Sequence, residues 1–168
     1  NMEAKTYIKA EVMTDRLDYL NNMGNNLAYC LAIEKLAELD VPPRAQAIRV
    51  ILTELQRISS HLVWLGTHAL DLAAMSVFLY CFRERELILD IFELCSGQRM
   101  MTTFFRPGGL WRDVPVEFEQ AVRDFIKSFP GNETNLAWVD KEIAAKKAYC
   151  STLAKVQYEI KAHQEALL

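Results

Sequence analysis

The chain has 168 residues, of which 51% are hydrophobic and 24% charged, and this length and composition are typical of one globular domain with a real core. Its formal net charge of −3 gives no reason to expect nucleic acid as a partner. The four cysteines stand singly, without the spacing of a zinc or iron–sulfur site, so no metal site is predicted and a reducing compartment is favoured.

The first half of the chain predicts an extended lead-in followed by two helices. Residues 3–13 alternate weakly between polar and apolar, which favours extended structure, and Thr14 and Asp15 are good N-cap residues for a helix over 17–36. Pro42 and Pro43 end that pattern. Helical spacing of apolar residues then predicts a long helix from Pro43 to Leu72.

The second half predicts three more helices around one irregular segment. A helix over 76–95 ends at a glycine that is typical of a helix C-terminus, and Pro115 opens a short amphipathic helix. The last helix runs from Asn135 to the end, with an apolar stripe. Residues 98–113 have no clear pattern apart from a turn at 106–109, and no strand pair is convincing. The prediction is a single all-α domain over 1–168, a bundle of about five helices with short connections.

The apolar run over 61–82 contains one full-time charge, Asp71. The run is long enough to span a bilayer, but its two histidines, its aspartate and its charged flanks favour a buried helix. A buried aspartate usually has a hydrogen-bond or ion-pair partner, or a functional role. Thr67, one turn earlier, is the nearest hydrogen-bond donor to Asp71. His61 and His68 are seven residues apart, too far for a two-histidine metal site on a helix, and are interpreted as structural.

Several collinear motifs resemble one known family. They are the Thr14–Tyr19 run Thr-Asp-Arg-Leu-Asp-Tyr, the Thr-His-Ala-Leu-Asp motif that ends at Asp71, the Phe-Arg-Glu-Arg-Glu motif over 82–86, the Ser-Gly-Gln-Arg-Met motif over 96–100, and the Phe-Arg-Pro-Gly-Gly motif over 105–109. Together they closely resemble the D subunit of NADH:quinone oxidoreductase (respiratory complex I), which is related to the large subunit of nickel–iron hydrogenases. The resemblance covers about residues 1–130, while 131–168 form a C-terminal helix without it.

The resemblance implies a fragment of a peripheral-arm subunit that lines the quinone cavity, in NADH-to-quinone electron transfer coupled to proton translocation. It implies that Tyr19 hydrogen-bonds the quinone headgroup and that Asp71 pairs with a headgroup-binding histidine, so both are the expected catalytic and quinone-binding residues. No cofactor is bound by this chain itself, because the adjacent iron–sulfur cluster belongs to a neighbouring subunit. The implied partners are other complex I subunits and quinone, at the cytoplasmic side of the bacterial inner membrane.

The chain departs from the family pattern in three ways, and the first two are the evidence for an alternative function, a non-catalytic helical scaffold or assembly protein that retains the fold. The family's headgroup histidine lies in a segment before this chain begins, Met101 stands where the family often has a histidine beside the cluster, and 131–168 lack the family's downstream motifs. The nickel-binding cysteines of the hydrogenases are also absent. The isolated fragment is expected to be inactive and to self-associate through apolar patches around Trp64, Phe78, Phe104 and Phe105.

Overall fold

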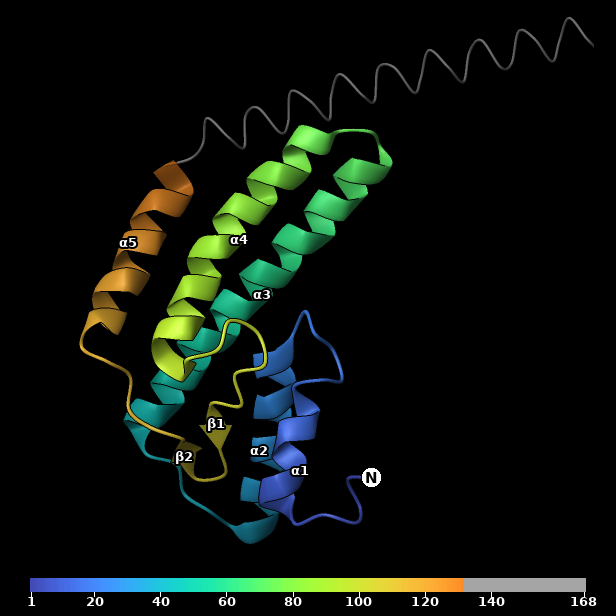
Figure 1. Cartoon of the computed structure of the whole chain (residues 1–168). Helices are drawn as coiled ribbons and strands as arrows, with labels where there is room; N and C mark the ends of the chain where they lie inside the picture. The colour runs from blue at the N-terminus through green and yellow to red at the C-terminus, as the bar shows by residue number, and fades with distance from the viewer. Residues whose placement is uncertain (132–168) are drawn as a thin grey trace, which may run out of the picture.

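The computed structural model describes residues 1–131, which form five helices and one short β-hairpin (Figure 1). The helices are α1 (Tyr7–Thr14), α2 (Asn22–Ala37), α3 (Pro43–Asp71), α4 (Met75–Ser96) and α5 (Glu117–Gly131). Helices α3 and α4 form a long antiparallel hairpin, with α5 packed beside α4 and the α1–α2 pair on the other side (Figure 1). The prediction of a mostly helical fold is confirmed, although the connection between α4 and α5 covers residues 97–116 and contains the β-hairpin.

The α3–α4 hairpin begins and ends where the sequence predicts, to within a residue. Pro43 opens α3, where its fixed φ suits a first helical position and its missing N–H costs nothing. Helix α4 ends at Gly97, which takes a left-handed φ of 77° and donates its N–H to the carbonyl of Glu93. The chain reverses between the two helices within a short turn, where Ala73 has a φ of 62°.

One core joins the α3–α4 hairpin to α2, α5 and the segment before the β-hairpin. Its fully or nearly fully buried members are Met23, Cys30, Ile48, Leu52, Leu55, Ile88, Leu89, Ile91, Phe92, Cys95, Phe104, Phe105, Phe118, Val122 and Phe125. Phe104 and Phe105 are therefore core residues, and the expectation that they lie on an exposed patch is wrong. Burial also raises the pKa of the Cys30 and Cys95 thiols to about 12, which leaves both unreactive at neutral pH.

Helix α1 replaces the extended lead-in that the sequence predicts. Its buried residues are Ala10, Glu11 and Thr14, which follow helical spacing but are mostly polar, so apolar periodicity does not detect them. Thr14 ends α1 and Asp15 is its C-cap, so neither residue caps a following helix. The turn that follows leads to α2, which begins at Asn22.

The irregular segment after α4 contains a two-stranded antiparallel hairpin, although no strand pair is predicted there. Strand β1 (Phe105–Arg106) pairs with β2 (Gly109–Leu110) around the predicted turn, where Gly108 has a φ of 88°. Strands of two residues are too short to show an alternating pattern. The hairpin lies between the α1–α2 pair and the lower half of α3 and α4 (Figure 1).

The apolar run over 61–82 is divided between α3 and α4 at the hairpin turn. Among the helices of residues 1–131, none combines the length and the hydropathy that a membrane crossing requires. The predicted terminal helix from Asn135 lies outside the described residues.

Candidate functional site

A buried ion pair between α2 and α3 holds the β-hairpin in place. The two terminal nitrogens of Arg49 lie 3.0 and 2.6 Å from the carboxylate oxygens of Glu34, and these side chains are only 3% and 6% exposed. Arg49 also donates to the carbonyl oxygens of Arg106 and Gly109, at 2.7 and 2.8 Å. The Gly108 N–H completes the cluster by donating to Glu34 at 2.7 Å.

The electrostatics of Glu34 follow from these contacts. Burial alone would raise its pKa, but the Arg49 hydrogen bonds and charge and the Gly108 N–H together hold the pKa below its usual range. Glu34 is therefore a carboxylate at neutral pH, and its charge is matched by Arg49 within the same buried space.

A second buried carboxylate, Glu11 of α1, faces the other side of the hairpin. Arg106 lies 2.9 Å from one Glu11 oxygen, close enough for an ion pair although the contact lacks good hydrogen-bond geometry. Asn26 donates to the other oxygen at 3.3 Å and accepts the Phe105 N–H at 3.0 Å. The Arg106 guanidinium therefore has an acidic partner within the chain.

The third carboxylate, Asp15, joins the end of α1 to the segment before the hairpin. One of its oxygens accepts both the N–H and the hydroxyl of Thr103, at 2.6 and 2.8 Å. Asp15 is completely buried, and burial raises its pKa although the Thr103 donors and two nearby arginines oppose the shift. This contact spans 88 positions of the sequence.

Tyr19 lies in the turn between α1 and α2, and buried polar side chains anchor that turn. Gln56 of α3 donates to the Leu20 carbonyl at 2.7 Å, and Asn22 donates to the Met100 carbonyl. Within the turn, Asp18 accepts the Leu20 N–H at 2.9 Å. The Tyr19 side chain itself is 63% exposed, so a fixed backbone presents a phenol to the surface.

Met101 lies beside the same turn. Its sulfur is 3.6 Å from the Asn22 amide nitrogen, which is within reach of a weak hydrogen bond. The structure therefore brings the Tyr19 turn and the Met100–Thr103 segment together.

Asp71 is exposed, and the prediction that it is buried is wrong. It is the last residue of α3, at the tip of the α3–α4 hairpin, where no other described element packs over it (Figure 1). The expected donor, Thr67, instead gives its hydroxyl to the carbonyls of Val63 and Trp64, at 2.9 and 3.0 Å. A hydropathy pattern cannot distinguish the tip of a hairpin from the middle of a buried helix.

The structure does not join the two candidate residues. No hydrogen bond or ion pair among residues 1–131 connects Tyr19 with Asp71. Gln56, which holds the Tyr19 turn, lies near the middle of α3, whereas Asp71 ends the same helix, roughly 22 Å of helix rise further on. Each candidate therefore has a separate local environment.

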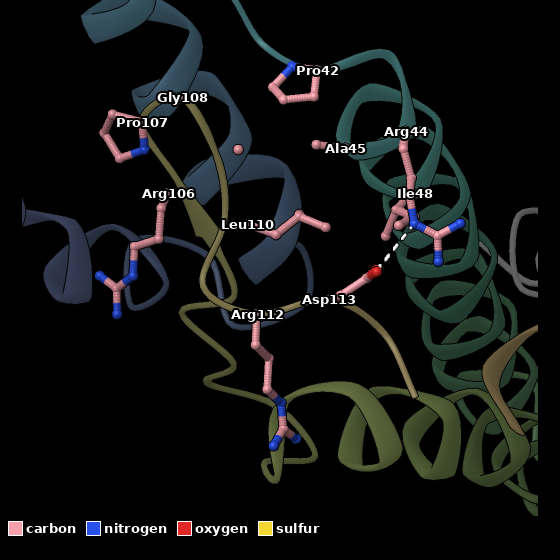
Figure 2. A pocket seen from close by; sticks show the side chains of 11 residues that line it. Pro42, Arg44, Ala45, Ile48, Arg106, Pro107, Gly108, Leu110, Arg112 and Asp113 are labelled. Atoms are coloured by element: carbon pink, nitrogen blue, oxygen red, sulfur yellow. Dashed lines mark hydrogen bonds and ion pairs between the residues drawn. The ribbon is translucent and has the colours of Figure 1, made fainter. Parts of the chain in front are cut away.

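A cavity of about 410 Å³ opens between the β-hairpin and the start of α3 (Figure 2). Three arginines line it, yet each has a partner. Arg44 pairs with Asp113 at 3.2 Å, and Arg106 points away from the cavity towards Glu11. Arg112 donates to the Cys95 carbonyl at 2.9 Å. These engaged cations do not make the cavity an anion site.

Sequence reasoning missed the buried polar contacts that build this region. Arg49 and Gln56 belong to a polar stripe at helical spacing, which suggests a solvated face, but both are buried and hydrogen-bonded. One feature of the sequence could have indicated this burial. The polar face of α3 contains many hydrogen-bonding side chains but lacks the alternating charges of a solvated helix surface.

Titration of Glu11 gives a testable pH dependence. Burial, reinforced by the charge of Asp15, raises its pKa above 4.5, while Arg106 and Asn26 oppose the shift. A carboxyl with a raised folded-state pKa contributes its full stability below the unfolded pKa and loses it as pH rises through the folded value. The stability of the wild type relative to Glu11→Gln, measured by urea unfolding at a series of pH values, should therefore fall as pH rises above 4.5 and through the folded-state pKa.

The matched control for Glu11 is Glu119→Gln, on the exposed face of α5. Glu119 pairs with Arg123 at the surface, where both side chains are mostly exposed, so this substitution should change the stability only slightly at every pH tested. A difference between the wild type and Glu11→Gln that did not change with pH would contradict the raised pKa of Glu11.

A known family matches the part of the chain that begins at the end of α3. The family described as "Respiratory-chain NADH dehydrogenase, 49 Kd subunit" matches residues 71–147. That match begins at Asp71 and includes α4, the β-hairpin and α5.

Individual relatives are similar over a longer stretch. The D 2 subunit of NADH-quinone oxidoreductase from Chloroflexus aurantiacus is 67% identical over 129 residues, which are 77% of this chain and 31% of the relative. The D 1 subunit from Roseiflexus castenholzii is 68% identical over 130 residues, again 77% of this chain and 31% of the relative. The D 1 subunit from Solibacter usitatus is 62% identical over 128 residues, or 76% and 31%. The chain thus spans about a third of the length of these curated relatives.

Proposed function

The chain belongs to the family of the D subunit of NADH-quinone oxidoreductase, and from that premise we propose that it forms part of the quinone-binding wall of this enzyme. The reaction is NADH-to-quinone electron transfer coupled to proton translocation. The observation that carries the proposal is identity of 67–68% to two such D subunits over about three quarters of the chain, a stretch long enough to include the helical core.

In this proposal Tyr19 donates a hydrogen bond to a quinone carbonyl. Its exposed phenol, on a turn held by Gln56 and Asn22, supports that role, because a donor on a fixed backbone loses little conformational freedom on binding. A phenol can also supply one of the protons that quinone reduction consumes.

Asp71 is proposed to pair with a headgroup histidine that another part of the enzyme supplies. Its exposure at the tip of the α3–α4 hairpin leaves the carboxylate accessible to such a partner. Several large apolar side chains are exposed near this tip, as expected for a surface that other parts of a complex cover: Trp64, Leu70, Leu72, Met75 and Leu79.

The remaining components of the reaction are assigned outside this chain. We propose that it binds no cofactor of its own, that quinone is the substrate, and that the iron–sulfur cluster belongs to a neighbouring subunit. The site lies on the cytoplasmic side of the bacterial inner membrane, where the chain acts as a peripheral component.

The purified chain is also proposed to self-associate and to be inactive alone. An apolar groove of about 1100 Å³ lies between α3 and α5, and exposed Val50, Val116 and Ile126 contribute to its lining. A second copy that covers such a surface would remove apolar area from water.

The second candidate function is a non-catalytic scaffold that retains the fold, which Met101 favours. A thioether cannot take up a proton at the position where the family often has a histidine. In this alternative the chain assembles with its neighbours in the complex and does not support quinone reduction.

A segment exchange separates the two candidates. Residues 1–130 replace the matching segment of the D 2 subunit in the Chloroflexus aurantiacus enzyme, and the assembled complex is assayed with NADH and a quinone, and with NADH and an artificial acceptor. The proposal expects both activities, whereas the scaffold expects assembly and artificial-acceptor activity without quinone reduction. Met101→His in the same hybrid shows whether the methionine alone accounts for any loss.

A further inference from the structure

We infer that Asp15 is a positioning residue for Tyr19, because it locks the Tyr19 turn to the Met100–Thr103 segment. This inference rests on the proposed quinone site at Tyr19. Asp15 itself is buried and does not reach quinone, so it acts through the backbone that it holds.

The first support is the conformation of Thr103. Its φ of 42° lies in the left-handed region, which a β-branched residue rarely adopts. Such a conformation persists where surrounding contacts determine it. The contacts here are the two hydrogen bonds that the Thr103 N–H and hydroxyl donate to one Asp15 oxygen, at 2.6 and 2.8 Å.

The second support is the place of Asp15 in the turn. Tyr19 lies four residues after Asp15 and three residues before Asn22, and both flanking side chains bind the same Met100–Thr103 segment. The two ends of the turn are thus tied to one stretch of backbone. Loss of the Asp15–Thr103 hydrogen bonds would release the start of the turn, next to the C-terminus of α1. Asn22 and Gln56 would still hold the end of the turn.

The contact requires an acceptor oxygen at Asp15 rather than its negative charge. The second Asp15 oxygen is buried and has no hydrogen-bond partner among the described residues. An asparagine can therefore place its carbonyl on the Thr103 donors and its amide in the space of that second oxygen. Asp15→Asn should keep the arrangement, and Asp15→Ala should lose it.

The experiment measures KM and kcat for quinone in the assembled enzyme, with NADH and an artificial acceptor as the internal reference. Asp15→Ala should raise the quinone KM about tenfold, since small displacements of a positioned group are costly, while the reference activity stays level. Asp15→Asn should stay within about twofold of the wild type. Adding Thr103→Gly to Asp15→Ala should restore most of the loss, because glycine adopts a positive φ without help.

Two further variants provide an independent test and a control. Thr103→Val removes only the hydroxyl donor and should raise KM about threefold, even if Asp15→Ala fails to assemble. The exposed Asp40, in the connection between α2 and α3, is the matched control, and Asp40→Ala should leave both activities unchanged.

The outcomes distinguish this inference from the proposed site itself. Full quinone activity in Tyr19→Phe overturns the site, and the role of Asp15 with it. Reduced activity in Tyr19→Phe, with an unchanged KM in Asp15→Ala or in Thr103→Val, overturns only the role of Asp15. Failure of Thr103→Gly to restore KM, or an equal loss of both activities in Asp15→Ala, would mean that Asp15 merely stabilises the fold.

Discussion

Arg49→Met is expected to lower the free energy of unfolding of the chain by about 3–5 kcal/mol. The substitution leaves the Glu34 carboxylate buried without its cation and removes the donors to the Arg106 and Gly109 carbonyls. Breaking one member of a buried pair is costly because the remaining charge has lost both water and partner. Urea unfolding of the purified chain at neutral pH measures the loss.

The control is Arg57→Met, in the neighbouring Arg57–Glu54 pair, whose side chains are 63% and 49% exposed. Its loss should stay below about 1 kcal/mol, since water solvates the carboxylate that remains. Similar losses in the two variants would contradict the buried-pair interpretation.

The pH dependence of Arg49→Met provides a further check on Glu34. The lowered pKa of Glu34 means that its stabilisation is present above its unfolded value of 4.5 and is lost as pH falls through the folded value. The difference between the wild type and Arg49→Met should therefore shrink in acid. A difference that grew as pH fell would contradict the lowered pKa.

The long helices could be predicted because their signals are local. Helices α3 and α4 carry sustained apolar periodicity, with Pro43 at one boundary and Gly97 at another, and these features act within a few residues. Helix α1 could not be predicted in the same way, because two of its three buried residues, Glu11 and Thr14, are polar. The burial of Glu11 depends on partners in α2 and the β-hairpin, far away in the sequence.

The same distinction between local signals and distant contacts applies to the candidate site. Tyr19 and Asp71 were identified by family motifs, and residue chemistry alone would not have selected Tyr19. The contacts that hold the Tyr19 turn join residues 78 and 88 positions apart, as in Asn22–Met100 and Asp15–Thr103. Such pairings follow from the packed fold, and a single sequence contains no periodic signal for them.

In the assembled enzyme, Tyr19→Phe is expected to lower quinone-dependent turnover at least about tenfold, since the hydroxyl is the group that binds the headgroup and can supply a proton. The fold should be kept, because the side chain is exposed and the ring remains. Tyr7→Phe on α1 is the matched control, as it removes the hydroxyl of another exposed tyrosine. The measurement is a paired assay, with NADH and quinone against NADH and an artificial acceptor.

Asp71→Asn should also lower quinone reduction selectively, because in the proposed function its carboxylate orients a histidine from another part of the enzyme. Asparagine keeps the size of the side chain but cannot stabilise a positive charge on that histidine, so quinone reduction should fall while the artificial-acceptor activity stays level. The loss should also change the pH profile of quinone reduction, because the carboxylate favours the protonated imidazole. Full quinone activity in both Tyr19→Phe and Asp71→Asn, or equal loss of the two activities, would show that these residues are not the quinone site.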